Sequence, residues 1–284
     1  MPKTIGNPLS WMAGAIGSAA GYASVAVAPA GADPAARPEV RRLTADDLRR
    51  SLRKGWEDMA VFRSDVVFVC LLYPVIGGLL LAMAARGSFI HLLFPVLSGF
   101  ALTGPVAALG LYEMSRRREA GGPVNWLALF EVMKSPRFGR ILMLSLFNVV
   151  IFLVWIMLAD LIYGLTMGPE VPVSYAAFVR EVLTSPAGWA LAVLGTGTGF
   201  VLALIVLAVG VVSFPLLLDR DVSLPVAVMT SVRVSRENPL VIGLWGLIVA
   251  GLLALGSLPA LLGLVLALPL LGHATWHLYR AAVL

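Results

Sequence analysis

The stretch ILMLSLFNVVIFLVWIMLADLIYGLT, residues 141–166, decides the fold class, because Asp160 is its one charged side chain. At 1.5 Å per residue, a helix of this length can cross the roughly 30 Å hydrocarbon core of a bilayer. At that depth only helices and closed barrels satisfy their own backbone polar groups, and the alternating pattern of a membrane β-strand is absent here. We therefore interpret the stretch as a transmembrane helix.

Further apolar runs flank this stretch on both sides. The mean hydropathy of the 284 residues is +0.91, with 59% hydrophobic and only 13% charged residues. That charged share is about half of what soluble domains carry. The sequence thus predicts an all-α integral membrane protein whose transmembrane domain, residues 65–284, has six helices. The predicted spans are about 65–85, 89–112, 141–166, 188–218, 239–256 and 258–279.

Two segments precede the first predicted span. Residues 1–36 are rich in Ala, Gly, Ser and Pro, and we expect a disordered leader that is not cleaved. Residues 37–64 are basic, with Leu52, Trp56 and Met59 at helical spacing. This pattern predicts an amphipathic helix lying along the membrane surface. Similar amphipathic segments precede the third and fifth spans.

The basic residues indicate the orientation of the chain. With these spans, all but two of the 21 Lys and Arg residues lie on one side of the membrane, the exceptions being Arg86 and Arg180. Cytoplasmic loops carry such an excess of basic residues, so both termini are predicted to be cytoplasmic. The net charge of +5 then points to anionic lipids of the bilayer as partners, and not to nucleic acid.

Several motifs resemble a known family. They include GLYEMSRRREAG at 110–121, FPLLLDRDV at 214–222, TSVRVSRENP at 230–239 and PLLGHATWHLYR at 269–280. Together with GWEDM and LLYPVIG, they are similar to domain of unknown function family 2189, from about residue 40 to the C-terminus. The resemblance implies a polytopic protein of the bacterial inner membrane with no established activity. Some members are labelled cytochrome c oxidase subunit I, but three histidines are too few for that subunit's metal ligands.

His273 and His277 are the candidate metal ligands. They are four residues apart and so share one face of a helix, a spacing that suits two ligands of zinc or copper, or one axial ligand of a haem. The alternative is that both histidines form ordinary hydrogen bonds, with no cofactor bound. Trp56, Trp126, Trp276 and Tyr279 are expected to be aromatic anchors at the membrane interface.

Carboxylates end two of the predicted spans. Glu113 follows the second and Asp219 the fourth, and these carboxylates are expected to pair with Arg116, Arg220 or Arg280 across the cytoplasmic ends of the bundle. Such pairs set helix register more than they add stability. A catalytic acid–base pair would need an accompanying nucleophile or substrate motif, and we found none. The middle of the spans also lacks the ionisable residues that mark ion pathways.

Three hypotheses about function follow, none of which makes the protein an enzyme. The first is a scaffold, or an assembly factor, for a membrane complex. The second is an accessory protein that binds a metal or haem at His273 and His277. The third is passive transport of a lipid or small apolar molecule. Ligand, protein partners and oligomeric state stay open at this point.

Overall fold

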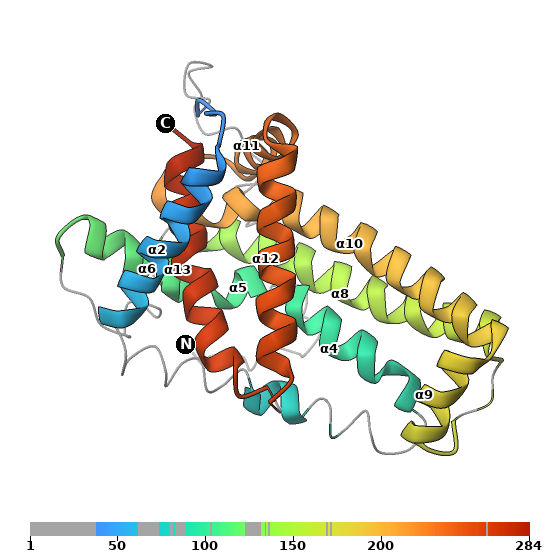
Figure 1. The fold of residues 1–284 in the computed structure, drawn as a ribbon. Helices are drawn as coiled ribbons and strands as arrows, with labels where there is room; N and C mark the ends of the chain where they lie inside the picture. The colour runs from blue at the N-terminus through green and yellow to red at the C-terminus, as the bar shows by residue number, and fades with distance from the viewer. Residues whose placement is uncertain are drawn as a thin grey trace, which may run out of the picture.

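The protein is described by a computed structural model (Figure 1). It describes residues 38–61, 74–79, 82, 89–102, 104–122, 132–133, 135, 137–168, 170, 172–259 and 261–284. The predicted leader, Cys70 and most of the first predicted span lie outside these residues.

The described residues are helical, and their β-structure is limited to one isolated bridge between Val40 and Val283. The all-α class predicted from the sequence is therefore confirmed. The helices are α2 (Ala45–Val61), η2 (Ile90–Leu92), α4 (Leu93–Leu102), α5 (Gly104–Ala107), α6 (Leu109–Glu119), α8 (Phe138–Thr166), α9 (Tyr175–Thr184), α10 (Pro186–Asp219), α11 (Leu224–Glu237), α12 (Pro239–Ser257) and α13 (Leu264–Ala282).

Three of these helices, α8, α10 and α12, are long and apolar enough to cross a membrane. Their bounds agree within a few residues with the predicted spans 141–166, 188–218 and 239–256. Only 28% of the most apolar window of α8 and 17% of that of α12 is buried inside the protein, against 61% for α10. Large apolar side chains therefore cover the outside of α8 and α12, as expected of helices that contact lipid.

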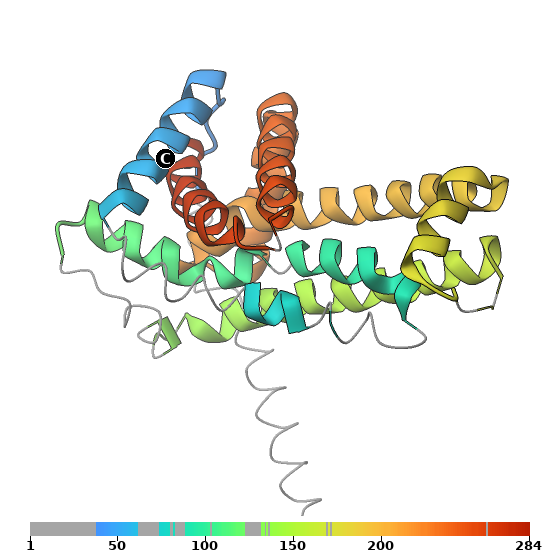
Figure 2. The same ribbon diagram turned by 60° about the horizontal axis from the view of Figure 1, so that its bottom comes forward.

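Helices α8 and α10 form an antiparallel pair joined by the short helix α9 (Figures 1 and 2). Serine side chains begin both later helices. Ser174 accepts a hydrogen bond from the backbone N–H of Ala177, and Ser185 accepts one from Gly188. These are N-caps that satisfy free N–H groups of the first turn. Pro186 occupies the first turn of α10, where its missing N–H has no cost.

The predicted second span, 89–112, is divided. The described residues from 90 to 119 form η2, α4, α5 and α6 instead of one continuous helix. Pro105 lies in the short helix α5, and a proline removes a backbone donor and crowds the preceding turn. The last helix of this series, α6, carries Arg116, Arg117 and Arg118 in its last turn.

Helix α13 is held between α2 and α6. A Cβ atom at Gly55 of α2 would lie 2.7 Å from the backbone nitrogen of Ala274, and one at Gly272 would lie 2.4 Å from the Leu111 side chain. Glycines thus permit close contact on both sides of α13. Figure 1 shows α2 and α13 side by side, with the chain before α2 beside the C-terminus. Figure 2 shows α8 and α10 extending away from this pair.

Candidate functional site

Helix α2 turns a polar face toward the protein. Its buried residues are Asp47, Leu48, Ser51, Gly55 and Asp58, which follow one another at helical spacing. The apolar residues that the sequence assigned to the membrane surface lie elsewhere on the helix, with Trp56 exposed. Carboxylates on the buried face need partners inside the protein, because an unpaired buried charge is strongly unfavourable.

Asp58 finds these partners in a polar cluster that we define as Asp58, Ser115, Arg118, His273 and His277. Ser115 Oγ donates a hydrogen bond of 2.5 Å to Asp58 Oδ2, and His277 Nε2 lies 2.9 Å from the same oxygen. Arg118 donates to the other oxygen, Oδ1. One carboxylate from α2 therefore connects α6, which carries Ser115 and Arg118, with α13, which carries both histidines.

His273 joins the polar cluster through Ser115. Its Nδ1 atom lies 2.8 Å from Ser115 Oγ and 4.0 Å from Asp58 Oδ2. Ser115 has a single hydrogen, which it donates to Asp58, so its oxygen accepts from His273. His273 Nδ1 therefore carries a proton, and the hydrogen bonds run in one direction from His273 through Ser115 to Asp58.

The cluster keeps Asp58 ionised. Burial on its own would raise the pKa of Asp58, but hydrogen bonds from His277 and Ser115, and the charges of the histidines when protonated, hold it below its ordinary value. Asp58 is 4% exposed, Ser115 1% and His273 0%. Asp58, Ser115 and His273 therefore form an enclosed connection between three helices, while the Arg118 and His277 side chains are 37% and 11% exposed.

The same enclosure limits the chemistry that these side chains can perform. The structure brings a serine, a histidine and an aspartate together, which the sequence spacing did not show. A nucleophilic serine needs an accessible oxygen whose proton a base can remove, whereas Ser115 is buried and donates to Asp58. Among the described residues, no group of three His, Cys, Asp or Glu side chains is arranged to hold a metal ion.

A second group, which we call the Asp219 cluster, lies at the end of α10. Tyr279 donates a hydrogen bond of 2.7 Å to Asp219 Oδ2, and Arg280 Nη1 lies 3.4 Å from that oxygen. Glu119 of α6 accepts from Trp276 Nε1 at 3.1 Å and contacts Arg280 Nε at 3.3 Å. These contacts tie α13 to the ends of α6 and α10.

Glu113 and Arg220 also have partners in the structure. Glu113 pairs within its own helix, with Arg116 Nε and Arg117 Nε each at 2.7 Å. Burial alone would raise its pKa, but hydrogen bonds from these two arginines hold it below its ordinary value. Arg220 donates to the backbone oxygen of Leu284 at 2.9 Å. Glu113 and Arg220 therefore do not pair with each other.

The aromatic residues fall into two groups. Trp56 is 58% exposed, as a membrane anchor requires, and Trp126 lies outside the described residues. Trp276 and Tyr279 are buried at 1% and 0% exposure, and their rings pack against each other with centroids 5.4 Å apart. Their polar atoms bind Glu119 and Asp219 inside the protein, and their role as anchors at the interface stays a prediction.

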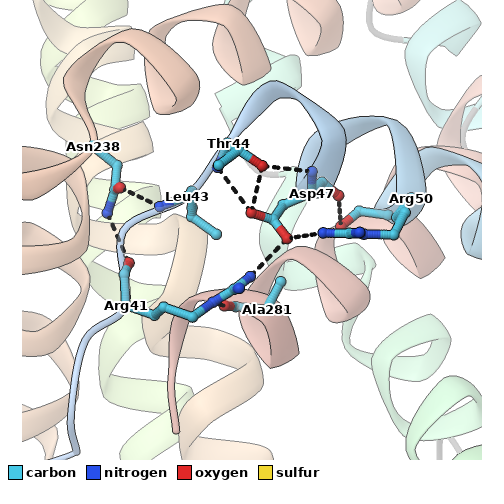
Figure 3. Close-up of polar contacts among 8 residues, drawn as sticks. Arg41, Leu43, Thr44, Asp47, Arg50, Asn238 and Ala281 are labelled. Atoms are coloured by element: carbon cyan, nitrogen blue, oxygen red, sulfur yellow. Dashed lines mark hydrogen bonds and ion pairs between the residues drawn. The ribbon is translucent and has the colours of Figure 1, made fainter.

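The chain before α2 is fastened to the C-terminal half (Figure 3). Asn238, between α11 and α12, accepts a 2.6 Å hydrogen bond from the backbone N–H of Leu43 and donates to the Arg41 carbonyl at 3.3 Å. Asp47 receives hydrogen bonds from Arg41 at 2.7 Å, Arg50 at 2.6 Å and the backbone N–H of Thr44 at 2.8 Å. Although burial opposes it, these bonds hold the pKa of Asp47 below its ordinary value.

Sequence reasoning missed the centre of this arrangement. It named His273 and His277 but not Asp58 and Ser115, which bind them, or Arg118, which donates to Asp58. One signal was present, because Asp47, Ser51, Gly55 and Asp58 recur at intervals of four, four and three residues. Such a stripe of polar and small residues on one helix face indicates close packing against another helix.

The comparisons with known proteins agree with the membrane assignment. A family model described as predicted integral membrane protein (DUF2189) matches residues 93–219. This region belongs to the DUF2189 family. The resemblance inferred from the motifs is thus confirmed, and this region contains GLYEMSRRREAG, whereas the motifs at 230–239 and 269–280 lie beyond it. Neither the curated proteins nor the solved structures gave a match.

The DUF2189 region holds only part of the contacts described above. It contributes α4 to α10, and with them Ser115, Arg118 and Asp219. Asp58 and the two histidines come from helices on either side of it. The chain outside the DUF2189 region therefore completes both clusters, through α2 and α13.

Proposed function

We propose that this DUF2189 protein is a non-enzymatic scaffold, or an assembly factor, of the bacterial inner membrane. It has six spans in this proposal, with both termini in the cytoplasm. The exposed apolar surfaces of α8 and α12 and the distribution of basic residues support the topology.

The observation that carries this proposal is the enclosure of the polar cluster. Its carboxylate, hydroxyl and imidazole groups bind one another, so the cluster stabilises the contact of α2, α6 and α13 without an accessible reactive group. Polar groups that do remain accessible lie on the outer faces of helices. A protein built in this way is suited to present surfaces to partners.

Helix α11 provides one such surface. It buries Ala227, Ser231 and Val234 and leaves Met229 60% exposed, one turn before the exposed Arg233. An exposed methionine beside a charge is typical of a contact surface for another protein. Because α11 carries basic residues, it lies on the cytoplasmic side in the proposed topology.

Photo-crosslinking in native membranes tests the scaffold. A photoreactive amino acid at Met229 is expected to give an adduct of defined mass with another membrane protein. The same amino acid at Val173, which is 97% exposed before α9 and lies on the opposite side in this topology, serves as the matched control. Absence of a protein adduct from Met229 in correctly inserted protein would refute the proposal.

A second candidate function is a metal-binding accessory protein that uses His273 and His277. The described side chains are not arranged to hold an ion, so binding would require the polar cluster to rearrange. Two imidazoles and one carboxylate are ligands that zinc accepts. Binding would require His277 to exchange its 2.9 Å hydrogen bond with Asp58 for the ion. Stoichiometric metal in the purified protein, lost in the H273A/H277A variant, would establish this function, whereas metal-free folded protein would exclude it.

A further inference from the structure

A groove lies between α2 and α12, with α13 at its base. It has a volume of about 590 Å³ and is lined by Leu52, Arg53, Trp56, Ile248, Gly251, Leu252, Leu255 and Leu270. The residues from α12 run from Ile248 to Leu255, two helical turns, or about 10 Å at 1.5 Å per residue. The groove is therefore elongated along the direction of the helices.

The walls of the groove are apolar. Leucine and isoleucine side chains from three helices supply most of the surface, and no atom lies within 4 Å of the position that a Cβ atom would occupy on Gly251. The groove is thus open at this glycine. Open apolar surface of this kind is unfavourable in water and favours a flexible hydrocarbon chain in a membrane protein.

One edge of the groove is basic. Arg53 lines it almost entirely through carbon atoms, while its side chain is largely exposed, and Arg49, one turn earlier on the same face of α2, is exposed as well. Arg53 Nε lies 3.7 Å from Glu57 Oε1, with both side chains more than half exposed. Exposed pairs of this kind contribute only about 0–1 kcal/mol, so the guanidinium can turn to a stronger anion. Phosphate is such an anion, because it accepts two parallel hydrogen bonds from one guanidinium.

We propose that this groove binds an anionic phospholipid. One acyl chain lies along α12 against Gly251 and Leu252, and the phosphate contacts Arg53 with support from Arg49. Trp56 covers the junction between chain and headgroup, where amphipathic rings are favoured. The inference rests on the proposed membrane location and not on the scaffold role. Charge complementarity identifies the occupant, since an uncharged apolar partner would leave the basic edge unused.

Lipid binding to the purified full-length protein tests this site. Native mass spectrometry in mild detergent would count bound molecules during titration with phosphatidylglycerol or with phosphatidylcholine of the same chains. The variant Gly251→Phe places a ring in the groove. Gly243→Phe is the matched control, because Gly243 is on the same helix, also has no atom within 4 Å of a Cβ, and does not line the groove.

We expect the wild-type protein and G243F to bind phosphatidylglycerol at least about tenfold more tightly than phosphatidylcholine, and G251F to lose this tight binding. A second variant, R49Q/R53Q, should bind the two lipids equally. Circular dichroism of each variant checks that it is folded. Equal binding of phosphatidylglycerol by G251F and the wild-type protein would overturn the proposal. So would a dimer of the wild-type protein that G251F dissociates, because the groove would then be occupied by a second copy of the chain. The scaffold proposal is tested separately, because it fails only if the photoreactive amino acid at Met229 gives no protein adduct.

Discussion

Replacement of Asp58 by alanine should destabilise the folded protein. Asp58 accepts hydrogen bonds from Ser115, His277 and Arg118. The Arg118 side chain is 37% exposed and can bind water instead, but Ser115 is buried and the His277 side chain is only 11% exposed. Each enclosed donor that loses its acceptor costs about 1–3 kcal/mol. The expected loss is thus about 2–6 kcal/mol.

The free energy of unfolding can be measured by titrating detergent-solubilised protein with SDS and following circular dichroism. Asp46→Ala is the matched control, because Asp46 is exposed in the first turn of the same helix, where a carboxylate contributes less than about 1 kcal/mol. Asp58→Asn should have an intermediate effect, since its amide oxygen can still accept from Ser115 and His277. If D58A were no less stable than D46A, the polar cluster would not hold the three helices together.

The dependence of this effect on pH follows from the lowered pKa of Asp58. A carboxylate whose pKa is lower in the folded than in the unfolded state stabilises the protein fully above its unfolded value, here 3.8. This contribution is lost as pH falls through the folded pKa. The difference in unfolding free energy between the wild-type protein and D58A should therefore shrink as the pH falls below 3.8. A difference that grew as the pH fell below 3.8 would contradict the ionised state of Asp58.

Three further predictions concern packing, the N-terminal attachment and topology. Gly55→Ala should cost about 1–3 kcal/mol of unfolding free energy, because the added Cβ would lie 2.7 Å from the backbone nitrogen of Ala274. Gly243→Ala, where the added Cβ has no atom within 4 Å, should be neutral or stabilising. Equal effects of the two changes would refute the close contact of α2 and α13. Asn238→Ala should cost about 1–3 kcal/mol of unfolding free energy and speed proteolysis of the chain before α2, because the backbone N–H of Leu43 loses its acceptor. An unchanged rate of proteolysis would show that this hydrogen bond does not hold the segment in place. In a C70S background, an impermeant maleimide added to intact cells should label V173C and not R236C, and the reverse labelling would invert the proposed orientation.

Apolar periodicity and length were enough to predict the three long helices. The bounds of α8, α10 and α12 depend on local features, namely charge-free runs and the prolines and serines at their starts. The division of the second predicted span was harder to foresee, because proline is tolerated in many membrane helices. In this protein the described chain around Pro105 forms several short helices instead.

The role of α2 shows the limit of reasoning from one helix. Its apolar residues, Leu52 and Trp56, suggested a helix resting on the membrane, and Trp56 is indeed exposed. Its opposite face, however, is buried although it carries Asp47 and Asp58. A carboxylate in a sequence is expected at the surface unless its partners are known. The partners of Asp58 on α6 and α13 are far away in the sequence.

The sequence by itself determined the helical membrane class, the positions of the long apolar helices and the family resemblance. Each of these depends on composition or on patterns within one segment. Only the tertiary structure decided that Asp58, Ser115 and His273 meet, that Trp276 and Tyr279 are internal, and that a groove opens beside Gly251. The physical reason is that hydrogen bonds and close packing act over about 3–4 Å between residues whose separation along the chain carries no information about their distance.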